Sequence, residues 1–159
     1  MAQEFLSRSF WLEKLVLKGT ERSENMDFYI YTAIQNCPNI LHIEILDSNI
    51  SNDCFDTMLE AYEDLTTLVL ISTCLQNDVG KIAYLRKLRN LTLSGYHYKF
   101  TSEDLILLAQ NCGHLQSLKM ERVRLFPEIF RNLKAQTITF THLLRHDYRR
   151  ALGVSTCRL

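Results

Sequence analysis

Few residues of this chain have the type and spacing needed for catalysis or metal binding. His142 and His146 lie four positions apart beside Asp147, so a helix there would place both imidazoles on one face. A zinc site would need a third protein ligand and a reason for an open position. The alternative, which we favour, is a pair of exposed histidines on a polar terminal segment. We therefore expect no metal site.

The five cysteines, Cys37, Cys54, Cys74, Cys112 and Cys157, are odd in number, and no two are spaced Cys-x-x-Cys. This pattern disfavours both a disulfide framework and a zinc site. It favours buried, reduced thiols in a cytoplasmic or nuclear protein. The N-terminal residues include an early acid and lack the apolar core of a secretory signal, which agrees with that location.

The composition excludes several classes of function. The chain has 18 basic and 18 acidic residues, whereas nucleic-acid binding depends on clustered Lys and Arg. No apolar run reaches the length that crosses a bilayer. The five glycines are dispersed, so they make no phosphate-binding loop, and no Gly-x-Ser-x-Gly motif occurs. We expect a non-enzymatic protein that uses no cofactor and binds neither nucleic acid nor membrane.

A recurring apolar pattern dominates the rest of the sequence. Gln35-Asn36-Cys37 returns as Gln110-Asn111-Cys112, and each copy leads through Pro38 or Gly113 into apolar-x-x-apolar-x-apolar. Units of 20 to 28 residues that can each hold one strand and one helix indicate a leucine-rich repeat solenoid. The pattern begins at Leu12, Ile40, Leu65, Leu88, Leu115 and Ala135.

The predicted fold is an α/β leucine-rich repeat solenoid, a right-handed βα superhelix of about six repeats with a curved parallel sheet on its concave face. We expect residues 1–11 to form an N-terminal cap, in which Phe5, Leu6, Phe10 and Trp11 are available to cover the open end of the solenoid. Residues 12–141 would form the repeats, and residues 142–159 a C-terminal cap and tail. The strands are expected around Leu15, Ile43, Leu68, Leu91, Leu118 and Ile138.

Helices are expected between the strands. One is predicted near residues 26–36, with Phe28, Ile30, Tyr31 and Ile34 on its buried face. A second begins after the predicted N-cap at Ser51–Asp53, a short one runs from about residue 78 to 87, and a clear one opens at residue 101. The residues expected to face inward are Phe55, Met58, Leu59 and Tyr62 in the second helix, and Leu105, Leu108 and Ala109 in the last.

Side chains alternate between the two faces of a strand, so the residues beside each middle pattern position are predicted to point outward onto the concave face. Leu46, Val69 and Ile71 would form an apolar centre among polar neighbours, which suits a protein partner. The alternative is that a segment of this chain or a second copy covers them. The first strand adds Lys14, Val16 and Lys18 to this face. The predicted partner-binding residues are His42, Glu44, Leu46, Thr67, Val69, Ile71, Asn90, Thr92, Lys119 and Glu121.

The two Gln-Asn-Cys copies resemble the cysteine-containing leucine-rich repeats of F-box/LRR proteins. In that class a cysteine closes each helix three positions before the first leucine of the strand, as Cys37 precedes Ile40 and Cys112 precedes Leu115. The class also places Asn, Cys, Thr or Ser eight positions after that leucine, where the side chain bonds neighbouring backbone. Residues that replace the cysteine are Tyr62 and Leu85. The eighth position holds Thr20, Ser48 and Thr73 in three repeats, while Tyr96 and Val123 depart from the pattern in two others.

The resemblance implies a protein-binding role in a ubiquitin ligase. F-box/LRR proteins typically recruit substrates to SCF-type ubiquitin ligases, with an N-terminal F-box on the adaptor and the repeats on the substrate. Only 11 residues precede the first predicted strand here, too few for an F-box. The resemblance thus suggests either a shortened member of the family or a substrate receptor whose SCF adaptor is supplied differently. The alternative is a scaffold or assembly factor of a larger complex, such as a mitochondrial one.

Overall fold

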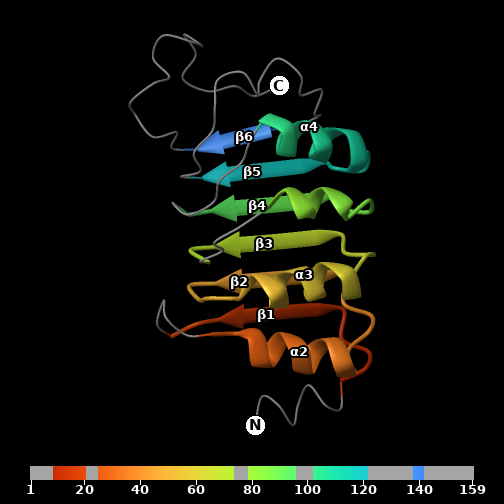
Figure 1. Ribbon diagram of the computed structural model, residues 1–159, viewed down its shortest axis with the longest axis vertical. Helices are drawn as coiled ribbons and strands as arrows, with labels where there is room; N and C mark the ends of the chain where they lie inside the picture. Colours follow the sequence, from red (N-terminus) through yellow and green to blue (C-terminus); the bar gives the residue numbers. More distant parts are fainter. Residues whose placement is uncertain (1–8, 21–24, 74–78, 96–101, 122–137, 142–159) are drawn as a thin grey trace.

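The structure is a computed structural model that describes residues 9–20, 25–73, 79–95, 102–121 and 138–141. Its main element is a six-stranded parallel sheet in which the strands are neighbours in chain order (Figure 1). Consecutive parallel strands require a crossover on each return, and the intervening chain supplies it. The strands are β1 (Lys14–Lys18), β2 (His42–Leu46), β3 (Thr67–Ile71), β4 (Asn90–Ser94), β5 (Ser117–Glu121) and β6 (Ile138–Thr141).

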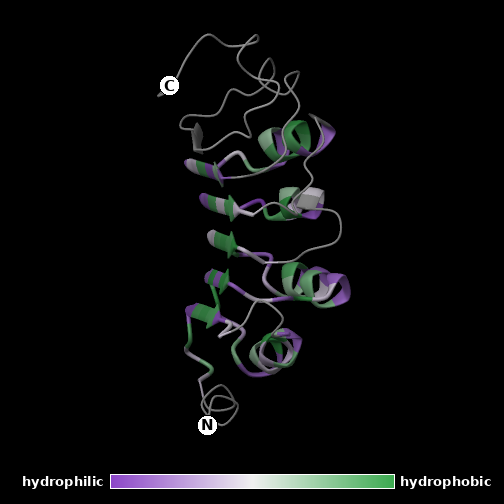
Figure 2. Ribbon diagram, turned by 90° about the vertical axis from the view of Figure 1, so that its left-hand side faces the viewer, coloured by the Kyte–Doolittle hydropathy of each residue, from purple (hydrophilic) through white to green (hydrophobic). Residues whose placement is uncertain are grey.

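The described helices form a second layer on one face of the sheet, and they leave the other face uncovered by any described helix (Figure 2). Their more hydrophobic sides face the strands and their hydrophilic sides face away. The chain therefore has an α/β fold of two layers with a single core between them. The helices are α2 (Asp27–Asn36), α3 (Asn52–Ala61), the 3-10 helix η1 (Val79–Tyr84) and α4 (Ser102–Asn111).

The strands lie where the apolar pattern predicted them. In β2, β3 and β4 the second and fourth residues are fully buried, and the residues between them are more accessible. This alternation follows from the pleat of an extended chain, in which successive side chains point to opposite faces. The fully buried strand residues are Ile43, Ile45, Leu68, Leu70, Leu91 and Leu93.

The backbone repeats the same hydrogen bonds from one unit to the next. At the start of a strand, two consecutive N–H groups donate to one carbonyl of the preceding unit, at 2.8 to 3.1 Å. Just past the end of a strand, one further N–H donates to the next strand. The carbonyls that accept two bonds belong to Glu13, Leu41, Thr66 and Arg89, and the donors past the strand ends belong to Gly19, Asp47, Ser72 and Gly95.

The helices bury equivalent positions. Residues at i, i+3 and i+7 share one side of a helix, and this stripe faces the sheet in α2, α3 and α4. The Ser51 hydroxyl accepts a hydrogen bond from the backbone N–H of Cys54 at 3.2 Å, which confirms the predicted N-cap of α3. The three buried stripes are Ile30, Ala33 and Cys37; Phe55, Met58 and Tyr62; and Leu105, Leu108 and Cys112.

The prediction for the buried face of α2 was partly wrong. Phe28 and Tyr31 are 54% and 38% exposed, while Ala33 is fully buried. Phe28 and Tyr31 lie off the stripe defined by Ile30, Ala33 and Cys37. Phe28 comes two positions before Ile30 and Tyr31 one position after it, and neither spacing returns to the same side of a helix. Ala109 in α4 is also exposed, contrary to the prediction.

Two further predictions need correction. The helix expected up to about residue 87 ends at Tyr84 as a 3-10 helix, because the unit that begins at Leu65 has 23 residues before the next pattern leucine and leaves less chain for a helix. Phe10 and Trp11 were expected to cover the open end of the repeats, but they are 65% and 62% exposed. Their rings instead contact each other edge to face, with the ring centroids 4.9 Å apart. The remainder of the predicted N-terminal cap, with the predicted C-terminal cap and tail, lies outside the described residues.

Candidate partner-binding face

All ten predicted binding residues lie on the sheet face that no described helix covers, which we call the open face. The parallel register aligns its outward side chains from β1 to β5 in three rows. The first row is Lys14, His42, Thr67, Asn90 and Ser117. The second is Val16, Glu44, Val69, Thr92 and Lys119. The third is Lys18, Leu46, Ile71, Ser94 and Glu121.

The centre of the open face is apolar. Leu46 is the register partner of Ile71, and Val69 precedes Ile71 by two residues on the same strand, so the three side chains are neighbours. We call them the apolar patch. All three are half-buried, and Val16 at the edge of the sheet is 46% exposed. Aliphatic side chains therefore remain accessible where a partner could bury them.

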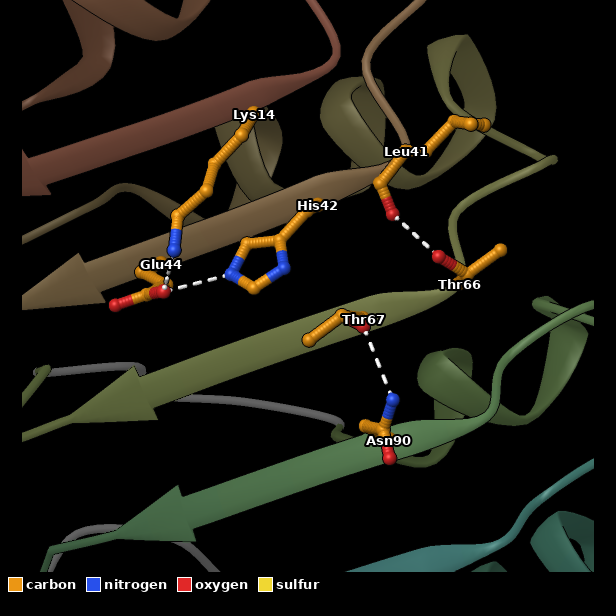
Figure 3. Close-up of polar contacts among 7 residues, drawn as sticks. All are labelled: Lys14, Leu41, His42, Glu44, Thr66, Thr67 and Asn90. Atoms are coloured by element: carbon orange, nitrogen blue, oxygen red, sulfur yellow. Dashed lines mark hydrogen bonds and ion pairs between the residues drawn. The ribbon is translucent and has the colours of Figure 1, made fainter.

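A charged cluster lies on β1 and β2 beside the apolar patch. Glu44 Oε1 is 2.6 Å from Lys14 Nζ and also 2.6 Å from His42 Nε2 (Figure 3). The hydrogen bond from Lys14 and then that from His42 lower the pKa of the Glu44 carboxyl below its ordinary value. A charge-assisted bond favours the ionised carboxylate, so Glu44 stays negative and is already paired within the face.

A second carboxylate is paired at the other end of the open face. Glu121 Oε1 lies 2.8 Å from Lys119 Nζ, and the Ser94 hydroxyl lies 3.2 Å from Glu121 Oε2. Both oxygens of this carboxylate thus have partners. The two ion pairs flank the apolar patch and form part of a polar rim around it.

Uncharged polar groups complete the rim on the first row. Asn90 Nδ2 donates to Thr67 Oγ1 at 3.2 Å across β3 and β4 (Figure 3). The neighbouring Thr66 hydroxyl donates to the backbone carbonyl of Leu41 at 3.0 Å, which ties the start of β3 to the preceding unit. These bonds hold the side chains of the rim in place before a partner arrives, which lowers the ordering cost of binding.

The list of predicted binding residues left out Lys14, Val16 and Lys18, although alternation assigned these three residues of β1 to the same face. Lys14 forms the ion pair with Glu44, and Val16 and Lys18 head the second and third rows. The signal was present in the sequence, because each of these residues precedes its partner on β2 by 28 positions. Tyr96, His97 and Tyr98 lie outside the described residues.

The helical side of the molecule carries a separate hollow of about 590 Å³ between α3 and η1. Ion pairs connect its two walls: Lys81 with Asp56, and Lys87 with Asp64 at 2.7 Å. Across the described ranges, no group of three or more His, Cys, Asp or Glu side chains is arranged to hold a metal ion. His142 and His146 lie outside those ranges.

The described cysteines are part of the core. Cys37, Cys54 and Cys112 are buried and form no disulfide. Burial raises the pKa of the Cys54 thiol to about 12 and that of Cys112 to about 11, and it also raises the pKa of Cys37. Thiolates are the reactive form of cysteine, so these three side chains are inert packing groups near neutral pH.

No described helix is both long enough and apolar enough to cross a membrane. No protein-family model matches the chain, and no curated protein is detectably similar to it.

Proposed function

We propose that this chain is a leucine-rich repeat solenoid of about six units that binds a partner protein on its open face and has no catalytic activity. The repetition of structure supports the solenoid. The same backbone bonds recur at the start and the end of successive strands, and α2, α3 and α4 bury the same three positions of their helices. A unit that recurs in this way buries its core only by stacking on its neighbours.

The chemistry of particular positions supports the leucine-rich repeat class. Cys37, Tyr62, Leu85 and Cys112 are all buried three positions before the first pattern residue of a strand. The Thr73 hydroxyl donates to the backbone carbonyl of Ile45 at 2.9 Å, which is the kind of bond that this class forms at the eighth position. Both features arise where the repeat pattern places them.

The observation that carries the binding function is the apolar patch at the centre of a polar open face. Leu46, Val69 and Ile71 lie between two internally paired carboxylates, Glu44 and Glu121. Protein interfaces commonly combine a dehydrated apolar centre with a polar rim. A rigid strand scaffold with prearranged polar neighbours favours recognition of another protein.

The resemblance to F-box/LRR proteins favours one biological setting for this binding. In that setting the chain presents a substrate protein to an SCF-type ubiquitin ligase for degradation, in the cytoplasm or nucleus. The buried cysteines at the ends of α2 and α4 are the structural feature that accords with this resemblance. Recovery of an SCF adaptor with the full chain would support the ligase setting, and recovery of a stable complex without an adaptor would favour a scaffold role.

Affinity purification of the full chain from its native cells tests the binding face. Val69→Glu places a charge in the apolar patch, whereas the matched control Leu107→Glu places one on a 42% exposed leucine of α4, which belongs to the helical layer. We expect both variants to keep the thermal unfolding curve of the parent chain, and Val69→Glu alone to lose the partner at least tenfold. Equal recovery with both variants would refute the open face as the binding surface.

A further inference from the structure

The charges of the open face are not balanced. From β1 to β5 the rows hold three lysines, Lys14, Lys18 and Lys119, and two carboxylates, Glu44 and Glu121. Each carboxylate already binds a lysine of the same face, at 2.6 Å and 2.8 Å. A basic group of a partner would therefore find no unpaired carboxylate there, while an acidic group would find a lysine.

Lys18 is that lysine. Its side chain is exposed, and it forms no ion pair with any residue that the structure describes. The one acid in its row is Glu121 on β5, and Asp47, which follows β2 and lies outside the three rows, forms no ion pair with Lys18 in the described ranges. Lys14, by contrast, shares Glu44 Oε1 with His42. The uncompensated positive charge of the face is thus located at the C-terminal end of β1.

The same row places Lys18 next to the apolar patch. Lys18 is the register partner of Leu46, and Leu46 is the register partner of Ile71. Neighbouring strands lie about 4.8 Å apart, so the midpoint between Leu46 on β2 and Ile71 on β3 is about one and a half strand spacings, or about 7 Å, from Lys18 on β1. An extended peptide that crosses the strands presents same-side residues about 6.7 Å apart. The distance from Lys18 to the apolar patch therefore matches the distance between residues i and i+2 of such a peptide.

We propose that the open face recognises an extended segment of the partner protein in which an Asp or Glu lies two positions from an aliphatic residue. The carboxylate binds Lys18, and the aliphatic side chain packs on Leu46 and Ile71. This inference rests on the proposed binding function and names the chemistry of the partner. The ion pair fixes the orientation of the segment, with its acidic end over β1.

Selection from a display library of random 12-residue peptides tests the inference on the full chain. We expect enriched peptides to carry an acid two positions from Leu, Ile or Val. Their Kd should weaken at least tenfold for Lys18→Glu and less for Lys18→Gln. Exchange of the peptide acid for lysine should restore binding to Lys18→Glu. The matched control is Arg86→Glu. It reverses the charge of an exposed side chain that lines the hollow on the helical side, and it should leave Kd unchanged.

The variants separate failure of this inference from failure of the proposed function. Peptides that lose binding with Val69→Glu but bind Lys18→Glu unchanged, or that are enriched in basic residues, would overturn the acidic motif and leave the open face as the binding surface. Peptides indifferent to Val69→Glu would overturn both. A selection without enrichment would overturn recognition of a linear segment. Thermal unfolding of each variant establishes that a loss of binding is not a loss of fold.

Discussion

Ser48 and Thr73 occupy equivalent positions in neighbouring units, but only the Thr73 side chain is hydrogen-bonded. Each follows a residue with positive φ at the end of a strand, Asp47 at 49° and Ser72 at 52°. The Thr73 hydroxyl donates to the carbonyl of Ile45 at 2.9 Å, while the buried Ser48 hydroxyl has no partner within the described part of the chain. Equivalent backbone turns in the two units thus carry one hydroxyl that is hydrogen-bonded and one that is not.

This difference predicts that two conservative substitutions change the free energy of unfolding differently. Thr73→Val keeps the shape of the side chain but removes the donor, so we expect the free energy of unfolding to fall by about 1 kcal/mol or somewhat more. Ser48→Ala removes a hydroxyl that has lost its hydration without gaining a bond, so stability should stay unchanged or rise slightly. Denaturant unfolding of the two variants measures both values. Equal losses would contradict the assigned bonding.

The strand positions and their register were predictable because the apolar pattern is strict. Three spaced apolar residues fix which strand side chains enter the core, and a shift by one residue would expose Ile43 and Leu68. The face of α2 was less predictable. Phe28 and Tyr31 are large and apolar enough to suggest burial, but packing against the sheet selected the stripe with the small Ala33. Helix periodicity alone cannot choose between the stripe that holds Ala33 and the side that holds Phe28 and Tyr31.

The candidate site was predictable in part for the same reason. Alternation assigned all ten outward residues to one face, and the register then aligned them in rows. The ion pairs were not predictable, because they depend on how Lys14 and His42 share one oxygen of Glu44. That geometry is set by side-chain conformations across two strands, which the spacing of residues does not encode.

The core of the sheet provides a direct test of register. Leu68 at the middle of β3 is fully buried, so Leu68→Ala should lower the free energy of unfolding by about 2–5 kcal/mol through lost burial and a residual cavity. Leu107→Ala in α4 is the matched control, because that leucine is 42% exposed and should cost less than about 1 kcal/mol. Denaturant unfolding measures both variants. Similar costs for the two would be incompatible with the register.

Tyr62 contains a second buried hydroxyl without a hydrogen-bond partner in the described ranges. Burial, followed by the nearby Cys37, raises the pKa of this phenol. Tyr62→Phe removes the unpaired group and keeps the ring, so stability should rise by about 1 kcal/mol. Tyr84→Phe serves as the control, because that side chain is 73% exposed, and it should change the stability little. A lower melting temperature for Tyr62→Phe would show that its hydroxyl does form a bond in solution.

The buried thiols predict a protection pattern. The pKa of Cys54 is about 12 and that of Cys112 about 11, so both stay protonated in the folded chain at pH 8. Iodoacetamide, followed by peptide mass mapping, should leave Cys37, Cys54 and Cys112 unmodified in the folded protein and label all three in denaturant. Unfolding should become easier above about pH 9, because the unfolded thiols then ionise while the folded ones retain their protons. Rapid labelling of the folded chain would contradict their burial.

Glu44 predicts a dependence of stability on acidic pH. Lys14 and His42 lower its pKa in the folded chain below the ordinary value of 4.5, so the unfolded state binds the proton more readily. The resulting contribution to stability, at most about 1 kcal/mol for so accessible a cluster, is present above pH 4.5 and is lost as the pH falls through the lower folded pKa. The stability difference between the parent chain and Glu44→Gln should therefore shrink between about pH 6 and pH 3 in denaturant unfolding. Glu63→Gln, at an exposed acid with no ion pair in the described ranges, should show a smaller change. If the difference for Glu44→Gln stayed constant over this range, the cluster would not persist in solution.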